Sequence, residues 1–163
     1  HGNLKLWDLA SGNMIREFSC ETGVVLCMVV HWPSRRVFSV LMDGTLQVWD
    51  LDEGGVIQQW HGHTEQVTCI TVNWDLNLAV SAAHDKTVKL WDMETGDNLL
   101  TLRPHMEPVF GLDVDWDEWR LLTASGDHTL MLWHIKAEGN VSERPLSFTA
   151  PRLPIWLCNH TGS

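Results

Sequence analysis

The sequence of 163 residues contains no tyrosine and only four cysteines, none of which form a Cys-x-x-Cys pair. This absence removes the usual ligand spacing of structural zinc sites and the redox pair of thioredoxin-like enzymes. Cys27 and Cys69 lie 42 residues apart, and we interpret them as small buried hydrophobic residues. Cysteines used in this way are typical of reducing compartments, so the sequence favours an intracellular protein, cytoplasmic or nuclear.

Positive charge is also scarce. Lys and Arg number 11 against 21 Asp and Glu, which gives a net charge of −10. This balance argues against nucleic acid or an anionic membrane as a partner, and Arg35-Arg36 is too small a basic patch to change that. No apolar run approaches the ~18 residues that cross a bilayer. The chain opens with His1 and shows no signal peptide, and we interpret His1 as a cut end.

The common catalytic motifs are missing as well. The sequence has no His-Glu-x-x-His, no phosphate-binding glycine loop and no Gly-x-Ser-x-Gly. The acidic run Asp113, Asp115, Asp117 and Glu118 could suggest acid–base catalysis, but we interpret it as the polar face of a strand and its turn. We therefore expect no enzyme activity, no catalytic residue, no metal site and no cofactor.

What the sequence does contain is a period of 42 residues. Tryptophans and aspartates recur at this interval in three series: Trp7, Trp49, Trp91 and Trp133; Trp32, Trp74 and Trp116; and Asp43, Asp85 and Asp127. Self-similarity at ~40–45 residues with Trp-Asp near the end of the repeat is typical of the four-stranded blades of a propeller.

The middle repeat illustrates how one blade would be built. Residues 67–72, 78–82, 87–91 and 99–102 favour four short strands, because apolar residues alternate along them or fill them. Residues 84–86 and 94–97 provide turn residues between strands. The sequence therefore predicts an all-β fold made of β-propeller blades.

Gly62-His63, Ser81, Asp85 and Trp91-Asp92 resemble a complete WD40 repeat of the G-protein-β type. In that family a His, a Ser or Thr, an Asp and a Trp form a hydrogen-bonded tetrad within each blade. Such a tetrad is chemically sensible because a buried Trp N–H, a hydroxyl and an imidazole all need partners. The resemblance implies these structural tetrads: His63, Ser81, Asp85 and Trp91; His105, Thr123, Asp127 and Trp133; and Ser39, Asp43 and Trp49, with Glu21 where the histidine belongs.

The resemblance covers nearly the whole chain and implies about four blades, three of them complete, in a single partial propeller. The expected segments are a half blade at 1–18, blades at 24–60, 67–102 and 109–148, and the start of a further blade at 154–163. Because the first and last blades lack strands, we expect an open arc rather than a closed ring. Exposed blade edges would then permit self-association.

Binding residues can be placed by the same resemblance. In WD40 propellers the narrower rim is the usual peptide-binding face, and this chain carries apolar residues at rim positions where charge is common. Trp119 lies in a turn that we expect at the opposite face, where it is either an exposed anchor or folded over its own turn. The alternative for the rim residues is packing against neighbouring loops. The candidate partner-binding residues are Met42, His84, Phe110, Leu26 and Trp119.

These observations favour a non-enzymatic scaffold or adaptor that binds protein or peptide partners. The alternative is that the segment is the regulatory or sensor part of a larger enzyme, a kinase or an NTPase, whose catalytic domain lies outside it. The repeat pattern alone does not separate these two functions.

Overall fold

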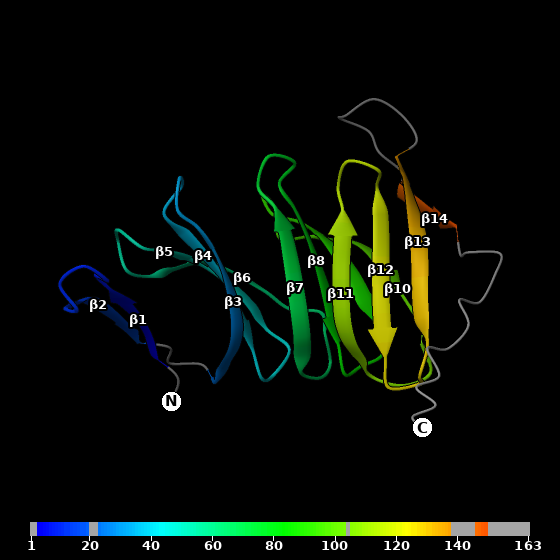
Figure 1. Cartoon of the computed structure of the whole chain (residues 1–163), viewed down its shortest axis with the longest axis horizontal. Helices are drawn as coiled ribbons and strands as arrows, with labels where there is room; N and C mark the ends of the chain where they lie inside the picture. The colour runs from blue at the N-terminus through cyan, green and yellow to red at the C-terminus, as the bar shows by residue number, and fades with distance from the viewer. Residues whose placement is uncertain (1–2, 20–22, 104, 138–145, 150–163) are drawn as a thin grey trace, which may run out of the picture. The chain divides into compact units, whose positions relative to one another are not determined.

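A computed structural model describes residues 3–19, 23–103, 105–137 and 146–149 (Figure 1). Within these ranges the chain is all β, without a helix and with no sheet closed on itself. The strands are β1 (Asn3–Trp7), β2 (Met14–Ser19), β3 (Val25–His31), β4 (Arg36–Leu41), β5 (Leu46–Asp50), β6 (Val56–Trp60), β7 (Val67–Asn73), β8 (Leu78–Ala83), β9 (Val88–Asp92), β10 (Asn98–Leu102), β11 (Val109–Asp115), β12 (Arg120–Ser125), β13 (Leu130–Ala137) and β14 (Leu146–Thr149).

The strands form antiparallel sheets in chain order. There is one two-stranded sheet, β1-β2, and three four-stranded sheets, β3-β4-β5-β6, β7-β8-β9-β10 and β11-β12-β13-β14. The prediction of an all-β chain of blade-like sheets is confirmed. The segment expected to start a further blade, 154–163, lies outside the described residues, as does position 21.

An aspartate directly follows Trp7, Trp49 and Trp91, and its carboxylate stabilises the turn that comes next. Asp50 accepts hydrogen bonds from the backbone N–H groups of Asp52 and Glu53 at 2.7 and 2.9 Å. The bonds from Glu53 and Asp52 lower the pKa of Asp50 below its ordinary value. Gly54 closes this turn at φ +85°, a left-handed conformation that glycine adopts without strain. Asp8 and Asp92 accept bonds in the same way in their own turns.

The chain divides into two compact units, residues 1–67 and 68–163. In unit 1 (residues 1–67) the hydrophobic core lies between the β1-β2 hairpin and the β3–β6 sheet. Phe18, Val37, Leu41, Trp49 and Leu51 are buried there, with Leu4 and Leu6 of β1 packed against them. Burial of such side chains contributes about 1.5–3 kcal/mol each.

In unit 2 (residues 68–163) the core lies between the β7–β10 and β11–β14 sheets. Val80 and Ala82 of β8 belong to the same buried cluster as Val114 of β11 and Trp133 of β13. Thr68 adds a polar link, because its hydroxyl lies 2.6 Å from the Val109 carbonyl oxygen and 3.0 Å from that of Ala82. The two sheets of this unit are therefore joined face to face, with β11 next to β8.

Candidate functional site

A tryptophan on the third strand of each four-stranded sheet donates its indole N–H to a hydroxyl on the second strand. Trp49 Nε1 lies 2.8 Å from Ser39 Oγ, and Trp91 Nε1 lies 2.8 Å from Ser81 Oγ. Trp133 Nε1 lies 3.3 Å from Thr123 Oγ1. All three hydroxyl residues are fully buried. A buried indole N–H needs such a partner, and each sheet supplies it at the same place.

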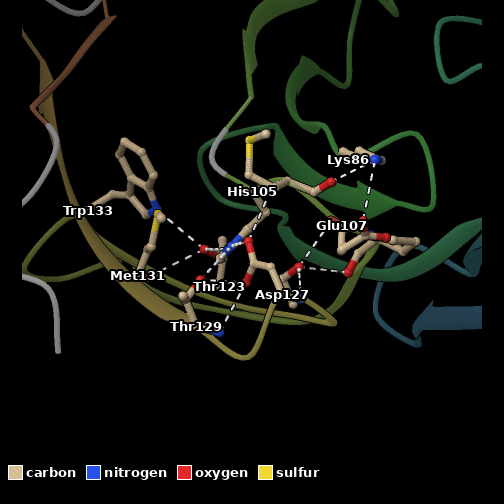
Figure 2. Close-up of polar contacts among 11 residues, drawn as sticks. Lys86, His105, Glu107, Thr123, Asp127, Thr129, Met131 and Trp133 are labelled. Carbon is tan, nitrogen blue, oxygen red and sulfur yellow. Dashed lines mark hydrogen bonds and ion pairs between the residues drawn. The ribbon is translucent and has the colours of Figure 1, made fainter. Parts of the chain in front are cut away.

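The sheet β11–β14 shows how this bond extends into a network (Figure 2). Thr123 Oγ1 lies 2.9 Å from His105 Nε2, and His105 Nδ1 lies 3.0 Å from Asp127 Oδ2. A neutral imidazole with its proton on Nδ1 satisfies both contacts, because Nδ1–H donates to the carboxylate and Nε2 accepts from the threonine hydroxyl. The chain of bonds runs from Trp133 through Thr123 and His105 to Asp127.

The Asp127 carboxylate ends this network and collects several donors. Its Oδ2 atom also accepts from the backbone N–H of Met106 at 3.0 Å, and Oδ1 accepts from the N–H and hydroxyl of Thr129 at 3.0 and 2.6 Å. Burial alone would raise its pKa, but the bonds from Thr129, Met106 and His105 outweigh this and hold the pKa of Asp127 far below its ordinary value. Asp127 therefore stays ionised and ties the loop before β11 to the turn before β13.

The sequence prediction missed one member of each turn, a threonine two residues after the aspartate. The Thr87 and Thr129 hydroxyls donate to Asp85 and Asp127, both at 2.6 Å, and the Thr45 backbone N–H donates to Asp43 at 2.9 Å. The residue between each pair has a positive φ, +87° at Gly44 and +66° at Lys86 and His128. The period of 42 residues contains the signal, because Thr45, Thr87 and Thr129 follow it.

Two of the remaining tetrad residues are the histidines of the loops before β7 and β11. His63 and His105 are both buried. Around His105 the contacts to a hydroxyl and a carboxylate are direct. Glu21, which stands where the third histidine would be, lies outside the described residues, so the expected missing bond to Ser39 stays a prediction.

The rim candidates of unit 2 lie together. His84 follows β8 and Phe110 lies in β11, and their rings meet edge to face at 5.4 Å and 85°. Gly126 makes room for the ring, since a Cβ there would lie 3.1 Å from Phe110 Cε2. Phe110 nevertheless stays 56% exposed. An aromatic side chain that is held in place by neighbours and open to solvent is suited to anchor a partner.

A charged group borders this aromatic pair. Lys86 Nζ lies 2.6 Å from the Met106 carbonyl oxygen and 3.9 Å from Glu107 Oε1, as Figure 2 shows. Met106 itself is largely exposed. We call His84, Met106, Phe110 and Gly126 the unit 2 rim site. Its apolar centre and charged border resemble the composition of a protein-binding surface more than that of a catalytic pocket.

The rim candidates of unit 1 form a second apolar group. Met42 is 57% exposed, and Val24 and Leu26 are exposed as well. The Met42 backbone N–H donates to the Val24 carbonyl oxygen at 2.9 Å, just as Gly126 N–H donates to Pro108 two repeats later at 3.0 Å. We call Val24, Leu26 and Met42 the unit 1 rim site.

Trp119 is not the exposed anchor but follows the other alternative, a ring folded over its own turn. It is half-buried, packs against the core of unit 2, and meets Trp116 edge to face at 6.3 Å. Its φ is +52°, like Arg35 and Asn77 at the same turn position, and this left-handed backbone turns the ring back over its own turn. The large apolar ring gains more from this packing than from exposure to water.

No three His, Cys, Asp or Glu side chains in the part of the chain that the structure describes are placed to hold a metal ion. No described helix is long and apolar enough to span a membrane. Cys69 is half-buried rather than fully buried, and burial raises the pKa of its thiol.

Comparison with known proteins identifies two of the sequence repeats. None of the curated proteins compared with the chain matches it. The family model described as WD domain, G-beta repeat matches residues 12–50 and 54–92. The first match spans β2 to β5 and the second spans β6 to β9, so each sequence repeat begins with the last strand of one sheet and continues through three strands of the next. WD40 repeats generally mediate protein–protein interactions and are typically non-catalytic. The chain therefore carries two WD40 repeats, and its blade-like sheets are consistent with a partial WD40 propeller.

Proposed function

We propose that this chain is a non-enzymatic scaffold, in the cytoplasm or nucleus, that binds protein or peptide partners through its two rim sites. The observation that carries the proposal is that the Phe110 ring is both packed and exposed. Its ring is fixed against His84 and over Gly126, yet more than half of it is open to solvent. An apolar ring already ordered before binding loses little conformational entropy when a partner covers it.

The surrounding groups support a peptide or a protein surface as the partner. Met106 extends the apolar area, while Lys86 and Glu107 are paired with each other at its border. A paired border adds specificity rather than large affinity, because exposed ion pairs contribute only about 0–1 kcal/mol. The chain's net charge of −10 argues against nucleic acid as the partner.

We expect the double variant Phe110→Ala/Met42→Ala to lose partners that the unchanged chain captures. Truncating a buried interface anchor commonly costs about 2 kcal/mol or more, which reduces retention about thirtyfold. The test is affinity capture from a cell extract, with bound proteins quantified by mass spectrometry. Leu99→Ala is the matched control, since Leu99 is an exposed apolar residue on β10.

A Trp119→Ala variant in the same experiment tests whether partners bind at the opposite end of the sheets instead of at the rim sites. If the double variant keeps every partner and Trp119→Ala loses them, the binding surface lies at the other end of the sheets. If both keep them, neither rim site binds and the proposal is wrong. All variants are first compared with the unchanged chain by thermal unfolding, so that loss of capture is not loss of folding.

A further inference from the structure

The loop between β10 and β11 forms the polar side of the unit 2 rim site, and neighbouring elements hold its backbone in place. The Met106 N–H donates to Asp127 Oδ2 at 3.0 Å, and the Met106 carbonyl oxygen accepts from Lys86 Nζ at 2.6 Å. The Ser125 hydroxyl lies 3.0 and 2.9 Å from the carbonyl oxygens of the next two loop residues. A loop that is ordered before binding loses little conformational entropy when a partner contacts it.

Gly126 lies beside both Phe110 and Glu107. A Cβ at this glycine would be 3.1 Å from Phe110 Cε2 and 3.6 Å from Glu107 Cβ. The same repeat position carries a large side chain in Met42 and His84. Phe110 is 56% exposed, and the Glu107 side chain is 57% exposed. The glycine therefore allows an aromatic ring and a carboxylate to lie near each other while both stay open to solvent.

The Glu107 carboxylate is only loosely neutralised by its ion-pair partner. Lys86 Nζ lies 3.9 Å from Glu107 Oε1 but 2.6 Å from the Met106 carbonyl oxygen (Figure 2). A close pair of an ammonium group and a carboxylate has its N and O atoms about 2.7–2.9 Å apart. Lys86 thus makes its short contact with a neutral carbonyl group, and the carboxylate retains the capacity to accept from a second cation.

The charges around the ring also favour a cation. The loops at this end of unit 2, residues 84–87, 103–108 and 126–129, carry three carboxylates against two cations: Asp85, Glu107 and Asp127 against Lys86 and Arg103. Asp127 stays ionised, because its hydrogen-bond donors outweigh burial and hold its pKa far below its ordinary value. The face of a phenylalanine ring carries partial negative charge and attracts cations as well. The net charge of −10 adds a field of the same sign over longer distances.

We propose that the unit 2 rim site binds a lysine or arginine side chain of the partner polypeptide. The apolar stem of that side chain lies over the exposed Phe110 ring, and its charged end reaches the Glu107 carboxylate. Met106 covers the stem from the loop side. This inference rests on the function proposed above and specifies the chemistry of the partner at one of the two rim sites.

An acidic partner group paired with Lys86 is the competing arrangement, and the contacts disfavour it. Such a group would lie beside the Phe110 ring, whose face repels anions. It would also lie close to the Glu107 carboxylate, 3.9 Å from the same ammonium group. Like charges at such a separation oppose binding.

The test uses the intact chain and short immobilised peptides with blocked ends and identical neutral flanking residues. The central residue is lysine, arginine, leucine or glutamate, and the amount of bound chain is measured at about pH 8, where histidine is ordinarily uncharged. We expect the lysine and arginine peptides to bind about fivefold to tenfold more tightly than the leucine peptide, from the ring contact and the ion pair together. The glutamate peptide should bind more weakly than the leucine peptide.

Substitutions in the chain assign this preference to the rim. Glu107→Gln and Phe110→Leu should each reduce the preference for lysine over leucine about threefold. Glu94→Gln is the matched control, because it removes the same charge from an exposed turn at the other end of the sheet, and it should leave the preference unchanged. Lys86→Gln, which can still donate to the Met106 carbonyl group, should strengthen binding of the lysine peptide about twofold, because it removes the competing cation.

Three results would overturn the inference: equal binding of the lysine and leucine peptides, an equal effect of Glu107→Gln and Glu94→Gln, or weaker lysine binding to Lys86→Gln. Absence of peptide binding to the unchanged chain would overturn it as well. Each of these outcomes is distinguishable from failure of the proposed function, which the capture experiment with Phe110→Ala/Met42→Ala tests. A chain that loses its partners in that experiment but shows no preference for lysine binds through the rim by apolar contacts alone.

Discussion

Replacing Phe38 by alanine should lower the free energy of unfolding by about 3–5 kcal/mol. Phe38 is fully buried on β4, and its ring meets Trp60 edge to face at 4.7 Å. Its removal leaves a cavity that a closely packed β-sheet core fills only in part, so the lost transfer energy and the cavity add together. Chemical denaturation followed by tryptophan fluorescence measures the change.

Two substitutions control for the nature of this effect. Phe38→Leu keeps most of the volume and should cost less than about 1.5 kcal/mol. Met42→Ala, four residues later and 57% exposed, should change stability by less than about 0.5 kcal/mol. If Phe38→Ala were as harmless as Met42→Ala, the packing assigned to β4 would be wrong.

Replacing Asp127 by alanine should lower the free energy of unfolding by about 2–4 kcal/mol, because the buried His105 imidazole and three further donors lose a charged acceptor. The side chain is only 12% exposed. The donors include the buried His105 imidazole, the Met106 N–H and both groups of Thr129. Asp117→Ala is the matched control, because Asp117 lies in an exposed turn of the same sheet.

The lowered pKa of Asp127 predicts that the free energy of unfolding depends on pH. The folded-state pKa of Asp127 is below its ordinary value of 3.8, so the folded chain binds this proton less readily than the unfolded chain. Its contribution to stability is therefore complete above that ordinary value and is lost as the pH falls below it. The free energy of unfolding should be measured between about pH 6 and pH 2 for the unchanged chain and both Asn variants. As the pH falls, the value for the unchanged chain should approach that of Asp127→Asn. The difference between the unchanged chain and Asp117→Asn should stay constant. Parallel curves for all three would contradict the network.

The sequence was sufficient to predict the blades because one physical unit is repeated. Each repeat needs a buried tryptophan, a hydroxyl that accepts its N–H and an aspartate that fixes a turn, and these residues recur at one interval. The resemblance of these repeats to WD40 repeats implied the contacts of Trp49, Trp91 and Trp133 with hydroxyl partners, and the structure contains them. The threonines at 45, 87 and 129 follow the same interval, but they became recognisable as turn residues only through their bonds to the aspartates.

Other features depend on packing that no periodic pattern encodes. Trp119 could have pointed into solvent or back over its own turn, and the balance was decided by contact with Trp116 and the core. The fixing of Phe110 by His84 depends on the small size of Gly126, which lies in a different strand connection. The exposure of Trp7 likewise depends on a neighbour strand, whereas its position in the repeat equals that of three buried tryptophans.

The central claim, that partners bind at the rim sites, is tested most directly by hydrogen–deuterium exchange of the chain with and without a captured partner. The account predicts that protection on binding concentrates in the loops at one end of the sheets, around residues 42–45, 84–87, 106–110 and 126–129. These loops carry Met42, His84 and Phe110. Protection confined instead to the turns at the other end, around 32–35, 74–77 and 116–119, would contradict it.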